Sequence, residues 1–266
     1  MAARVMGILN VTPDSFSDGG NFVDPDKAVA HAEAMRADGA DIVDVGGEST
    51  RPGAAPVDLD TELARVVPVI EALAPGGVVS VDTRHEPVAR AAVAAGATII
   101  NDVSASLWPV AADLGVGWIA MHMQGEPTTM QAAPDYDDVV GEVADFLDQR
   151  ARQASTAGVP DIWIDPGFGF GKTLDHNVEL LARLDRIIDL GWPVAIGTSR
   201  KSTLGALIAR SDGAEAPVDV DDRLVGSVVT EAIALAFGAD LIRVHDVKAA
   251  RQAATVVSGE LYMRSA

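Results

Sequence analysis

Apolar and polar positions recur along the chain in a repeating unit. A stretch with helical periodicity ends at a glycine, and a short apolar run that closes in polar residues follows it. Glycine suits the left-handed conformation that ends many helices, and a four-residue apolar run is typical of a strand buried on both faces. Each unit therefore predicts a helix followed by a parallel strand. The unit is found at residues 39–45, 96–102, 158–165, 191–197 and 238–245.

The same pattern, followed over the whole chain, predicts eight strands separated by helices. Eight such units in 266 residues indicate an α/β fold of the closed (β/α)8 type, a TIM barrel, rather than an open doubly wound sheet. No linker composition divides residues 1–266, so we expect a single domain. The strands are predicted at residues 5–10, 41–45, 78–82, 98–102, 118–121, 162–165, 193–197 and 241–244.

Two of the predicted helices show the helical period clearly. Their apolar residues recur three or four positions apart, which places them on one face toward the sheet. The acidic stretch of residues 212–222 lacks such a face and is interpreted as a solvated excursion. The two shared faces are Val139, Val143, Phe146 and Leu147, and Val178, Leu181, Leu184 and Ile188.

Composition excludes several classes of function. The chain has 20 Lys and Arg against 39 Asp and Glu, a net charge of −19, which argues against nucleic acid as a partner because a phosphate backbone would be repelled. It has no cysteine, which removes disulfides, thiolate metal sites and cysteine nucleophiles. It also lacks an apolar run of about 18 residues and a signal-peptide layout, so we expect a cytoplasmic protein with no membrane partner.

Polar side chains end several of the predicted strands, where a barrel carries its chemistry. Asp82, Asn101 and Asp165 end the third, fourth and sixth strands. Carboxylates and an amide around one pocket match a flat heterocycle with adjacent N–H and NH2 donors, such as a pterin or a guanine-like ring. The alternative is that these residues cap the following helices. Three of them together favour a ligand site.

Cationic groups are scarce, so their placement is informative. Arg51 lies in the loop after the second strand, Arg200 and Lys201 follow the seventh, and Arg243 and His245 close the eighth. Arginine forks and a histidine at the start of a helix predict a phosphate or diphosphate site. Pairing with surface carboxylates is the alternative, and it is favoured for Arg200. Arg243 ends an apolar strand, so we expect a ligand or an inward partner there.

A Mg²⁺ site is predicted at the end of the first strand. Asn10 offers a neutral oxygen, and Asp14 and Asp18 lie in the loop that follows. Together with diphosphate oxygens these could hold Mg²⁺, which keeps most of its shell as water and substrate oxygen. The remaining histidines are scattered and are interpreted as helix or loop residues rather than ligands: His31, His85, His122 and His176.

Seven segments, in order along nearly the whole chain, resemble the dihydropteroate synthase family. They run from the loop after the first strand to the end of the eighth. The resembling segments are 10–20 (NVTPDSFSDGG), 44–53 (DVGGESTRPG), 101–103 (NDV), 121–125 (MHMQG), 165–172 (DPGFGFGK), 197–202 (GTSRKS) and 243–247 (RVHDV).

The resemblance implies an α/β barrel that acts as a transferase in folate synthesis. Such an enzyme condenses 6-hydroxymethyl-7,8-dihydropterin diphosphate with 4-aminobenzoate, uses Mg²⁺, is a target of sulfonamide inhibitors and pairs as a homodimer. The residues implied to hold the pterin are Asp82, Asn101, Val103, Met121, Asp165, Phe170, Gly197 and Lys201.

The resemblance also assigns the other substrates and the chemistry. Mg²⁺ is expected at Asn10. The diphosphate is expected at Asn10, Thr50, Arg51, Arg243 and His245. The aminobenzoate pocket is expected from Phe16, Pro52, Lys201 and Ser202. The catalytic residues are expected to be Asp18, Arg51, Lys201, Arg243 and His245.

Two alternatives share this barrel. One is a pterin-binding methyl-transfer module, and the other is a synthase-like paralogue without activity. A methyl-transfer module has no use for a diphosphate clamp, so Arg51, Lys201, Arg243 and His245 favour the synthase. The family motifs in the first two loops and the motif Ser-Arg-Lys-Ser at residues 199–202 are complete, which weighs against the inactive paralogue.

Overall fold

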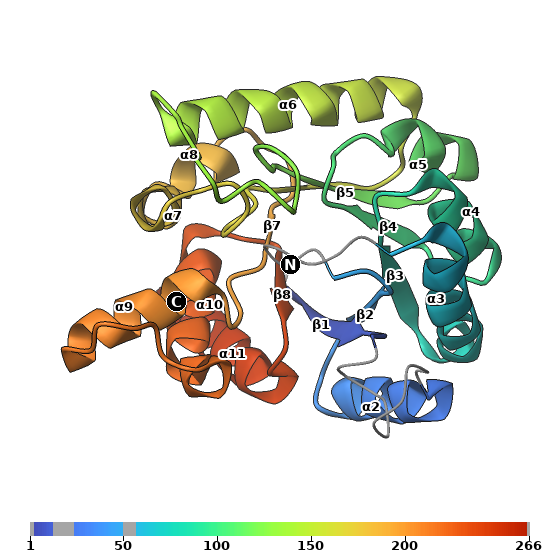
Figure 1. Cartoon of the computed structure of the whole chain (residues 1–266), viewed down its shortest axis with the longest axis horizontal. Coiled ribbons are helices and arrows are strands. Elements are labelled where there is room, and N and C mark those ends of the chain that lie inside the picture. The colour runs from blue at the N-terminus through green and yellow to red at the C-terminus, as the bar shows by residue number, and fades with distance from the viewer. Residues whose placement is uncertain (1–2, 13–23, 50–56, 265–266) are drawn as a thin grey trace.

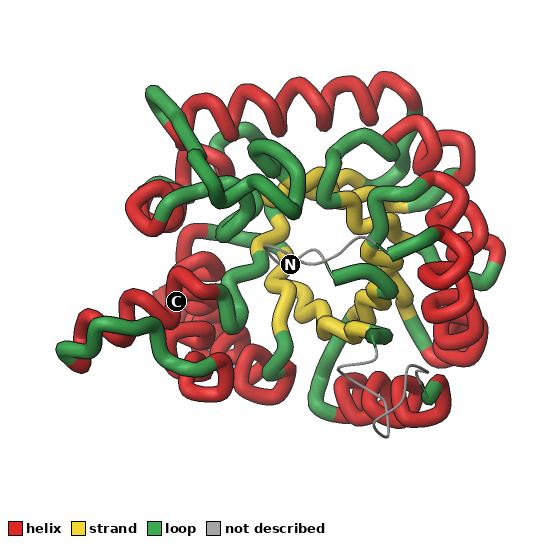
Figure 2. Tube along the Cα trace, viewed as in Figure 1, coloured by secondary structure: helices red, strands yellow, loops and turns green. Residues whose placement is uncertain are grey.

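A ring of eight parallel strands forms the centre of the computed structural model, which describes residues 3–12, 24–49 and 57–264 (Figure 2). Neighbouring strands follow the order β6-β5-β4-β3-β2-β1-β8-β7, and a parallel bridge between Ile164 and Val194 joins the two ends of that order. The closed barrel predicted from sequence is therefore confirmed. The strands are β1 Arg4–Asn10, β2 Ile42–Gly46, β3 Val78–Asp82, β4 Ile99–Asp102, β5 Gly117–Met121, β6 Ile162–Asp165, β7 Ala195–Ile196 and β8 Leu241–Val244.

The seventh strand is shorter than the pattern predicts. Only Ala195 and Ile196 form a ladder, with β8, while Val194 makes the isolated bridge to β6. The carbonyl of Pro193 accepts a hydrogen bond from the Ile164 amide at 2.9 Å. Proline has no N–H to return, so pairing stays incomplete at this seam of the barrel.

Helices surround the strands as an outer ring, and α9 projects away from the barrel (Figure 1). The helical segments are α2 Pro25–Ala37, α3 Leu59–Leu73, η1 Ala74–Gly76, α4 Glu86–Ala94, α5 Trp108–Leu114, α6 Val139–Ala157, α7 Leu174–Ala182, α8 Asp185–Ile188, α9 Ser202–Asp212, η2 Val220–Arg223, α10 Leu224–Phe237 and α11 Val247–Arg264. None of the described helices has both the length and the apolar character needed to cross a bilayer.

The helix predictions are confirmed in one segment and corrected in another. Val139, Val143 and Leu147 are buried along α6, as the period predicts. The face predicted over residues 178–188 is confirmed in part. Leu181, Leu184 and Ile188 pack on the core, but the segment breaks at Arg183 into α7 and α8, and Val178 is exposed. The acidic residues 212–222 are exposed almost throughout, which confirms the solvated excursion.

Strand alternation explains where the polar residues gather. One apolar cluster, built from alternate residues of seven strands, fills the lower part of the barrel interior: Met6, Ile42, Ile99, Ile119, Trp163, Ala195 and Leu241. Side chains two residues further on point to the same face, toward the carboxyl ends of the strands. Those positions are Ile8, Asp44, Asn101, Met121, Asp165, Gly197 and Arg243. The period of two thus places an acidic and cationic layer directly above an apolar floor.

Candidate functional site

Arg243 lies at the centre of the polar layer. Its Nε donates to Asp44 Oδ2 at 2.6 Å, and its Nη2 donates to Asp82 Oδ2 at 2.5 Å. Asp44 Oδ2 also accepts from Asn101 Nδ2 at 2.9 Å. Three strands therefore meet at one guanidinium, and β4 is joined to them through Asp44. The inward partner predicted for Arg243 is confirmed.

Asp82 presents an unsatisfied acceptor at this site. Its Oδ1 is buried, and no donor among the described residues reaches it. Burial raises the pKa of the Asp82 carboxyl to about 7, while the neighbouring charge of Arg243 acts in the opposite direction. A buried acceptor without a donor is costly unless a ligand supplies one. Oδ1 is therefore placed to accept an N–H from a bound molecule.

Asp165 and Lys201 form the opposite wall together with the glycine-rich loop after β6. Asp165 Oδ1 accepts from the Gly167 amide at 2.7 Å, and Lys201 Nζ donates to the Phe168 carbonyl at 2.8 Å. The same Nζ lies 3.9 Å from the centre of the Phe170 ring. Burial raises the pKa of Asp165 and lowers the pKa of Lys201 to about 7. This wall thus joins an apolar ring to one anionic and one cationic group.

Lys172, which the sequence analysis did not single out, organises that loop. Its side chain is 2% exposed, and Nζ lies within hydrogen-bond distance of the Gly167 carbonyl (3.1 Å), the Phe170 carbonyl (3.0 Å) and His122 Nδ1 (3.0 Å). Burial lowers the pKa of His122 to about 3, so its ring is neutral and its Nδ1 can accept a hydrogen bond from Lys172 Nζ. A lysine in a glycine-rich run is the signal that could have found it.

The end of β8 is organised by Ser199 and Asp246. Ser199 Oγ accepts from the His245 amide at 3.1 Å and lies 3.2 Å from its Nδ1. Arg200 pairs with Asp246 through two hydrogen bonds of 2.9 and 2.7 Å. The surface pairing predicted for Arg200 is therefore confirmed, while His245 lies at the carboxyl end of β8 beside the site.

The structure locates most of the other predicted residues around the mouth of the barrel. Val103 and Met121 are buried at the ends of β4 and β5, and the exposed Ser202 begins α9. Gly197 follows β7, and a Cβ there would contact Arg243. The remaining predicted residues lie outside the described part of the chain: Asp14, Phe16, Asp18, Thr50, Arg51 and Pro52.

Asn10 is the last residue of β1 and pairs in register with Gly46, which in turn pairs with Asp82. A Cβ on Gly46 would contact both Asn10 Oδ1 and Asp82, so glycine lets these two side chains share the mouth of the barrel. The amide oxygen of Asn10 suits Mg²⁺ that arrives with substrate oxygens, because Mg²⁺ keeps most of its shell as water and phosphate.

A second charged cluster lies where the chain leaves and re-enters the undescribed residues 50–56. Glu62 Oε1 accepts from Thr83, and its Oε2 lies 2.7 Å from His85 Nδ1. Glu48 accepts from Arg84 Nε at 3.3 Å and from the Val57 amide at 3.2 Å. The spacing of Glu48, Glu62 and His85 suits a metal ion, but each carboxylate oxygen already has a donor. The cluster therefore joins Glu48 and Val57 to the residues between β3 and α4. His85 is the N-cap residue of α4, which agrees with its interpretation as a helix or loop residue.

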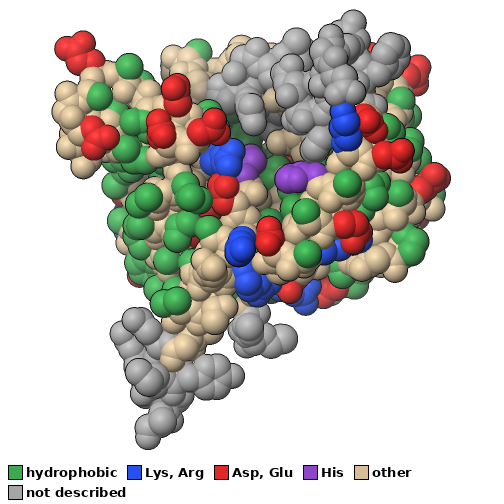
Figure 3. Space-filling view, turned by 90° about the horizontal axis from the view of Figure 1, so that it is seen from below, with side chains coloured by type: hydrophobic (Ala, Val, Ile, Leu, Met, Phe, Trp, Pro, Cys, Tyr) green, Lys and Arg blue, Asp and Glu red, His purple; other side chains and the backbone are tan. Residues whose placement is uncertain are grey.

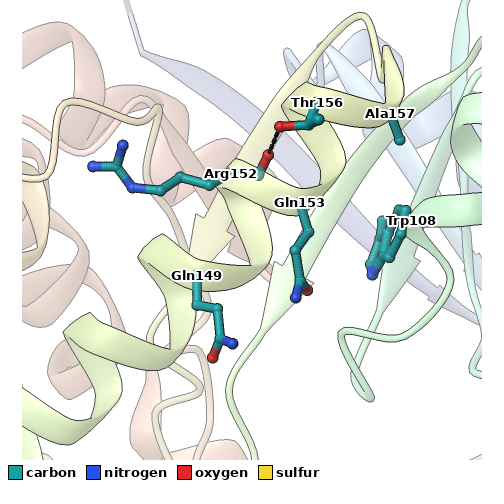
Figure 4. A pocket seen from close by; sticks show the side chains of 6 residues that line it. All are labelled: Trp108, Gln149, Arg152, Gln153, Thr156 and Ala157. Atoms are coloured by element: carbon teal, nitrogen blue, oxygen red, sulfur yellow. Dashed lines mark hydrogen bonds between the residues drawn. The ribbon is translucent and has the colours of Figure 1, made fainter.

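The outer surface carries a separate pocket of about 460 Å³ between α5 and α6 (Figure 4). Trp108 and Gln153 face it, whereas Arg152 points away from the tryptophan. It contains no carboxylate and none of the predicted site residues. On the face shown in Figure 3, acidic side chains are scattered among lysines and arginines, without a continuous basic surface in its described part.

Comparison with known proteins assigns this geometry to a family. The family model of pterin-binding enzymes matches residues 6–245. The chain belongs to the dihydropteroate synthase family of pterin-binding enzymes. It is 48% identical over 270 residues to the dihydropteroate synthase of Mycobacterium leprae, covering 97% of this chain and 94% of that one. It is 48% identical over 266 residues to the Escherichia coli K12 enzyme, covering 97% and 92%.

Solved structures of synthases agree in fold over nearly the whole chain. The Yersinia pestis dihydropteroate synthase in a sulfonamide complex matches with a TM-score of 0.89 at 44% identity, covering 100% of this chain and 95% of that one. The Xanthomonas albilineans enzyme with 7,8-dihydropteroate matches with a TM-score of 0.84 at 46% identity, covering 97% and 94%. The family resemblance read from the motifs is therefore confirmed.

Proposed function

We propose that this chain is a dihydropteroate synthase that condenses 6-hydroxymethyl-7,8-dihydropterin diphosphate with 4-aminobenzoate, giving 7,8-dihydropteroate and diphosphate. The observation that carries the proposal is the buried, unpaired Oδ1 of Asp82 beside Asn101 and Asp165. All three residues lie at the carboxyl ends of strands, at the same mouth of the barrel as Met121, and their hydrogen-bonding groups match the donor edge of a pterin. Relatives solved with 4-aminobenzoate or with 7,8-dihydropteroate support this substrate and this product.

The diphosphate is proposed to lie toward β1 and β8. Arg243 and His245 would meet its oxygens from β8, with Thr50 and Arg51 from the loop after β2. Mg²⁺ held at Asn10 would neutralise charge on the leaving diphosphate. With its oxygens held by Arg243 and His245, the diphosphate would be a good leaving group, and the carbon–oxygen bond of the pterin methylene would break early.

The chain's anions are proposed to stabilise the positive charge that develops on the pterin. Asp82 and Asp165 face the ring, and hydrogen bonds from ring N–H groups favour their ionised forms. The neutral amine of 4-aminobenzoate then forms the new carbon–nitrogen bond and releases a proton. This attack needs correct position more than a strong base. Phe16, Pro52, Lys201 and Ser202 would position the arylamine, and Asp18 would help exclude competing water.

Product analysis tests the proposal directly. Purified protein given both substrates and Mg²⁺ should release diphosphate and form dihydropteroate in equal amounts. Omission of 4-aminobenzoate should abolish dihydropteroate, which controls for simple hydrolysis of the pterin diphosphate. Sulfonamides should compete with 4-aminobenzoate, as the sulfonamide complex of the Yersinia pestis relative suggests. Pterin binding without either product would favour the methyl-transfer or inactive alternatives.

A homodimer formed through α10 is proposed as the working assembly. Val225, Val229, Ile233 and Phe237 lie four residues apart along one side of α10, and each is between 38% and 73% exposed. An apolar stripe of this kind on a surface helix is typical of an interface between protein chains. A second copy carries the same stripe, so a two-fold pairing would cover both.

A further inference from the structure

Asp44 is fully buried in β2, and one of its oxygens serves two residues of the site. Oδ2 accepts from Arg243 Nε at 2.6 Å and from Asn101 Nδ2 at 2.9 Å. Arg243 comes from β8 and Asn101 from β4, so Asp44 joins strands on either side of its own. In the ladder it pairs with Ile8 and Ser80, one inward-facing position below Asp82.

The contact with Asp44 fixes the orientation of the Arg243 guanidinium in the site. With Nε held by Asp44 and Nη2 by Asp82, no acceptor among the described residues meets Nη1. The guanidinium is planar, so anchoring two of its nitrogens sets the direction of the third. Asn101 is fixed in the same way, because donating Nδ2 to Asp44 turns its amide oxygen away from Asp44.

The buried Asp44 carboxylate does not serve the stability of the fold well. Asp44 Oδ1 is buried and has no partner among the described residues, and two carboxylates face one guanidinium. A neutral residue would remove an unpaired oxygen and an excess charge, since buried charges cost free energy unless fully paired. The free energy lost by burying Asp44 is explained if the site needs its carboxylate to orient Arg243 and Asn101.

We propose that Asp44 is a positioning residue, which orients Arg243 and Asn101 toward the pterin diphosphate without touching it. This rests on the proposed function of the site. A contrast is provided by Asp102, which is equally buried but faces the other side of the sheet. Its carboxylate is saturated by the amides of Ser104, Ser106 and Leu107 and by Trp118 Nε1. Asp102 stabilises the turn after β4, and its carboxylate hydrogen-bonds to no site residue that the structure describes, so a substitution there is a matched control for Asp44.

The first test is binding of 6-hydroxymethyl-7,8-dihydropterin diphosphate with Mg²⁺, measured by calorimetry without 4-aminobenzoate. Asp44→Asn keeps the Arg243–Asp82 pair, so its melting temperature should stay within about 3 °C of the wild type. Its affinity should fall by about tenfold or more. Asp102→Asn should melt earlier and bind within about threefold of the wild type. An Asp44→Asn protein that binds as tightly as the wild type overturns the proposal.

Coupling to Arg243 separates orientation from general structural damage. In an Arg243→Lys background the Nε contact is already lost, so adding Asp44→Asn should change affinity by less than about threefold. An equal loss in both backgrounds would assign Asp44 a merely structural role and overturn the proposal.

A ligand-free measurement distinguishes this inference from the proposed function. The Nε–H of Arg243 should give a slowly exchanging arginine signal in a ¹⁵N NMR spectrum, identified by its loss in Arg243→Lys. The signal should shift or disappear in Asp44→Asn and persist in Asp102→Asn. An unchanged signal in Asp44→Asn contradicts the positioning role. If the wild-type protein neither binds the pterin nor forms product, the proposed function is wrong. The Asp44–Arg243 contact would then serve no pterin diphosphate, even where the NMR signal shows that it exists.

Discussion

Lys201 lies against Phe170, with its Nζ 3.9 Å from the centre of the aromatic ring. The two residues come from different βα units, one at the start of α9 and the other in the loop after β6. The same ammonium donates to the Phe168 carbonyl, so one side chain joins the walls of the site supplied by the sixth and seventh units. An ammonium on an aromatic face is attracted by the ring electrons, and both of these side chains are half-buried.

Asp82→Asn should weaken pterin binding and remove part of its pH dependence. Burial raises the pKa of Asp82 to about 7, and ring N–H donors bind the carboxylate best. Wild-type affinity should therefore rise with pH between about 5 and 7, approaching tenfold per unit well below the pKa. Calorimetry across this range should find the rise abolished in the variant. A variant with wild-type affinity removes Asp82 from the pocket.

Arg243→Ala should lose about 2 kcal/mol or more of transition-state stabilisation, because it removes a charge-assisted contact to the leaving group. The measure is kcat/KM for the pterin diphosphate. Arg200→Ala is the control, since Arg200 is paired with Asp246. Unchanged kcat/KM for Arg243→Ala would refute its assigned role.

Lys172→Met should destabilise the glycine-rich loop. The substitution leaves the Gly167 and Phe170 carbonyls without their buried donor, at a cost of about 2 kcal/mol in the free energy of unfolding. Urea unfolding measures this loss. Lys248→Met is the matched control, since Lys248 is exposed on α11. Equal stabilities for the two variants would mean that Lys172 does not support the loop.

Glu231→Gln should make stability less dependent on pH. Burial, and then the charge of Asp246, raise the pKa of Glu231 to about 8 from 4.5. Between these values the unfolded chain has lost a proton that the folded chain keeps, so wild-type stability falls as pH rises. At pH 8 the variant should therefore melt at least about 3 °C above the wild type, with a smaller gap at pH 5. Thermal melts at both values are the measurement, and a constant gap contradicts the shift.

Val229→Asp should break the proposed homodimer by placing a charge in the centre of the apolar stripe of α10. Sedimentation should then give a monomer where the wild type gives a dimer. Leu59→Asp is the control, because Leu59 is also exposed but lies in the first turn of α3, where an acidic residue is tolerated. If the wild type sediments as a monomer at micromolar concentration, the proposed homodimer through α10 is wrong.

The sequence by itself determined the barrel and the residues at its mouth. Buried parallel strands are continuous apolar runs, and several of the helices before them end at a glycine with positive φ, as Gly115, Gly158 and Gly238 show. Both signals are local, so residue order alone carries them. The same periodicity places Asp82, Asn101 and Asp165 at strand ends, and the carboxyl ends of barrel strands share one face.

Only the tertiary structure decided which of these residues meet. Arg243 contacts Asp44 and Asp82, which are 199 and 161 residues away, because closure of the barrel brings β8 beside β1 and opposite β3. The same closure buries Asp44, while Lys172 is buried where the loop after β6 packs against His122. Neither contact has a local signature, since pairing across a closed sheet depends on strand register and burial depends on everything packed around a residue.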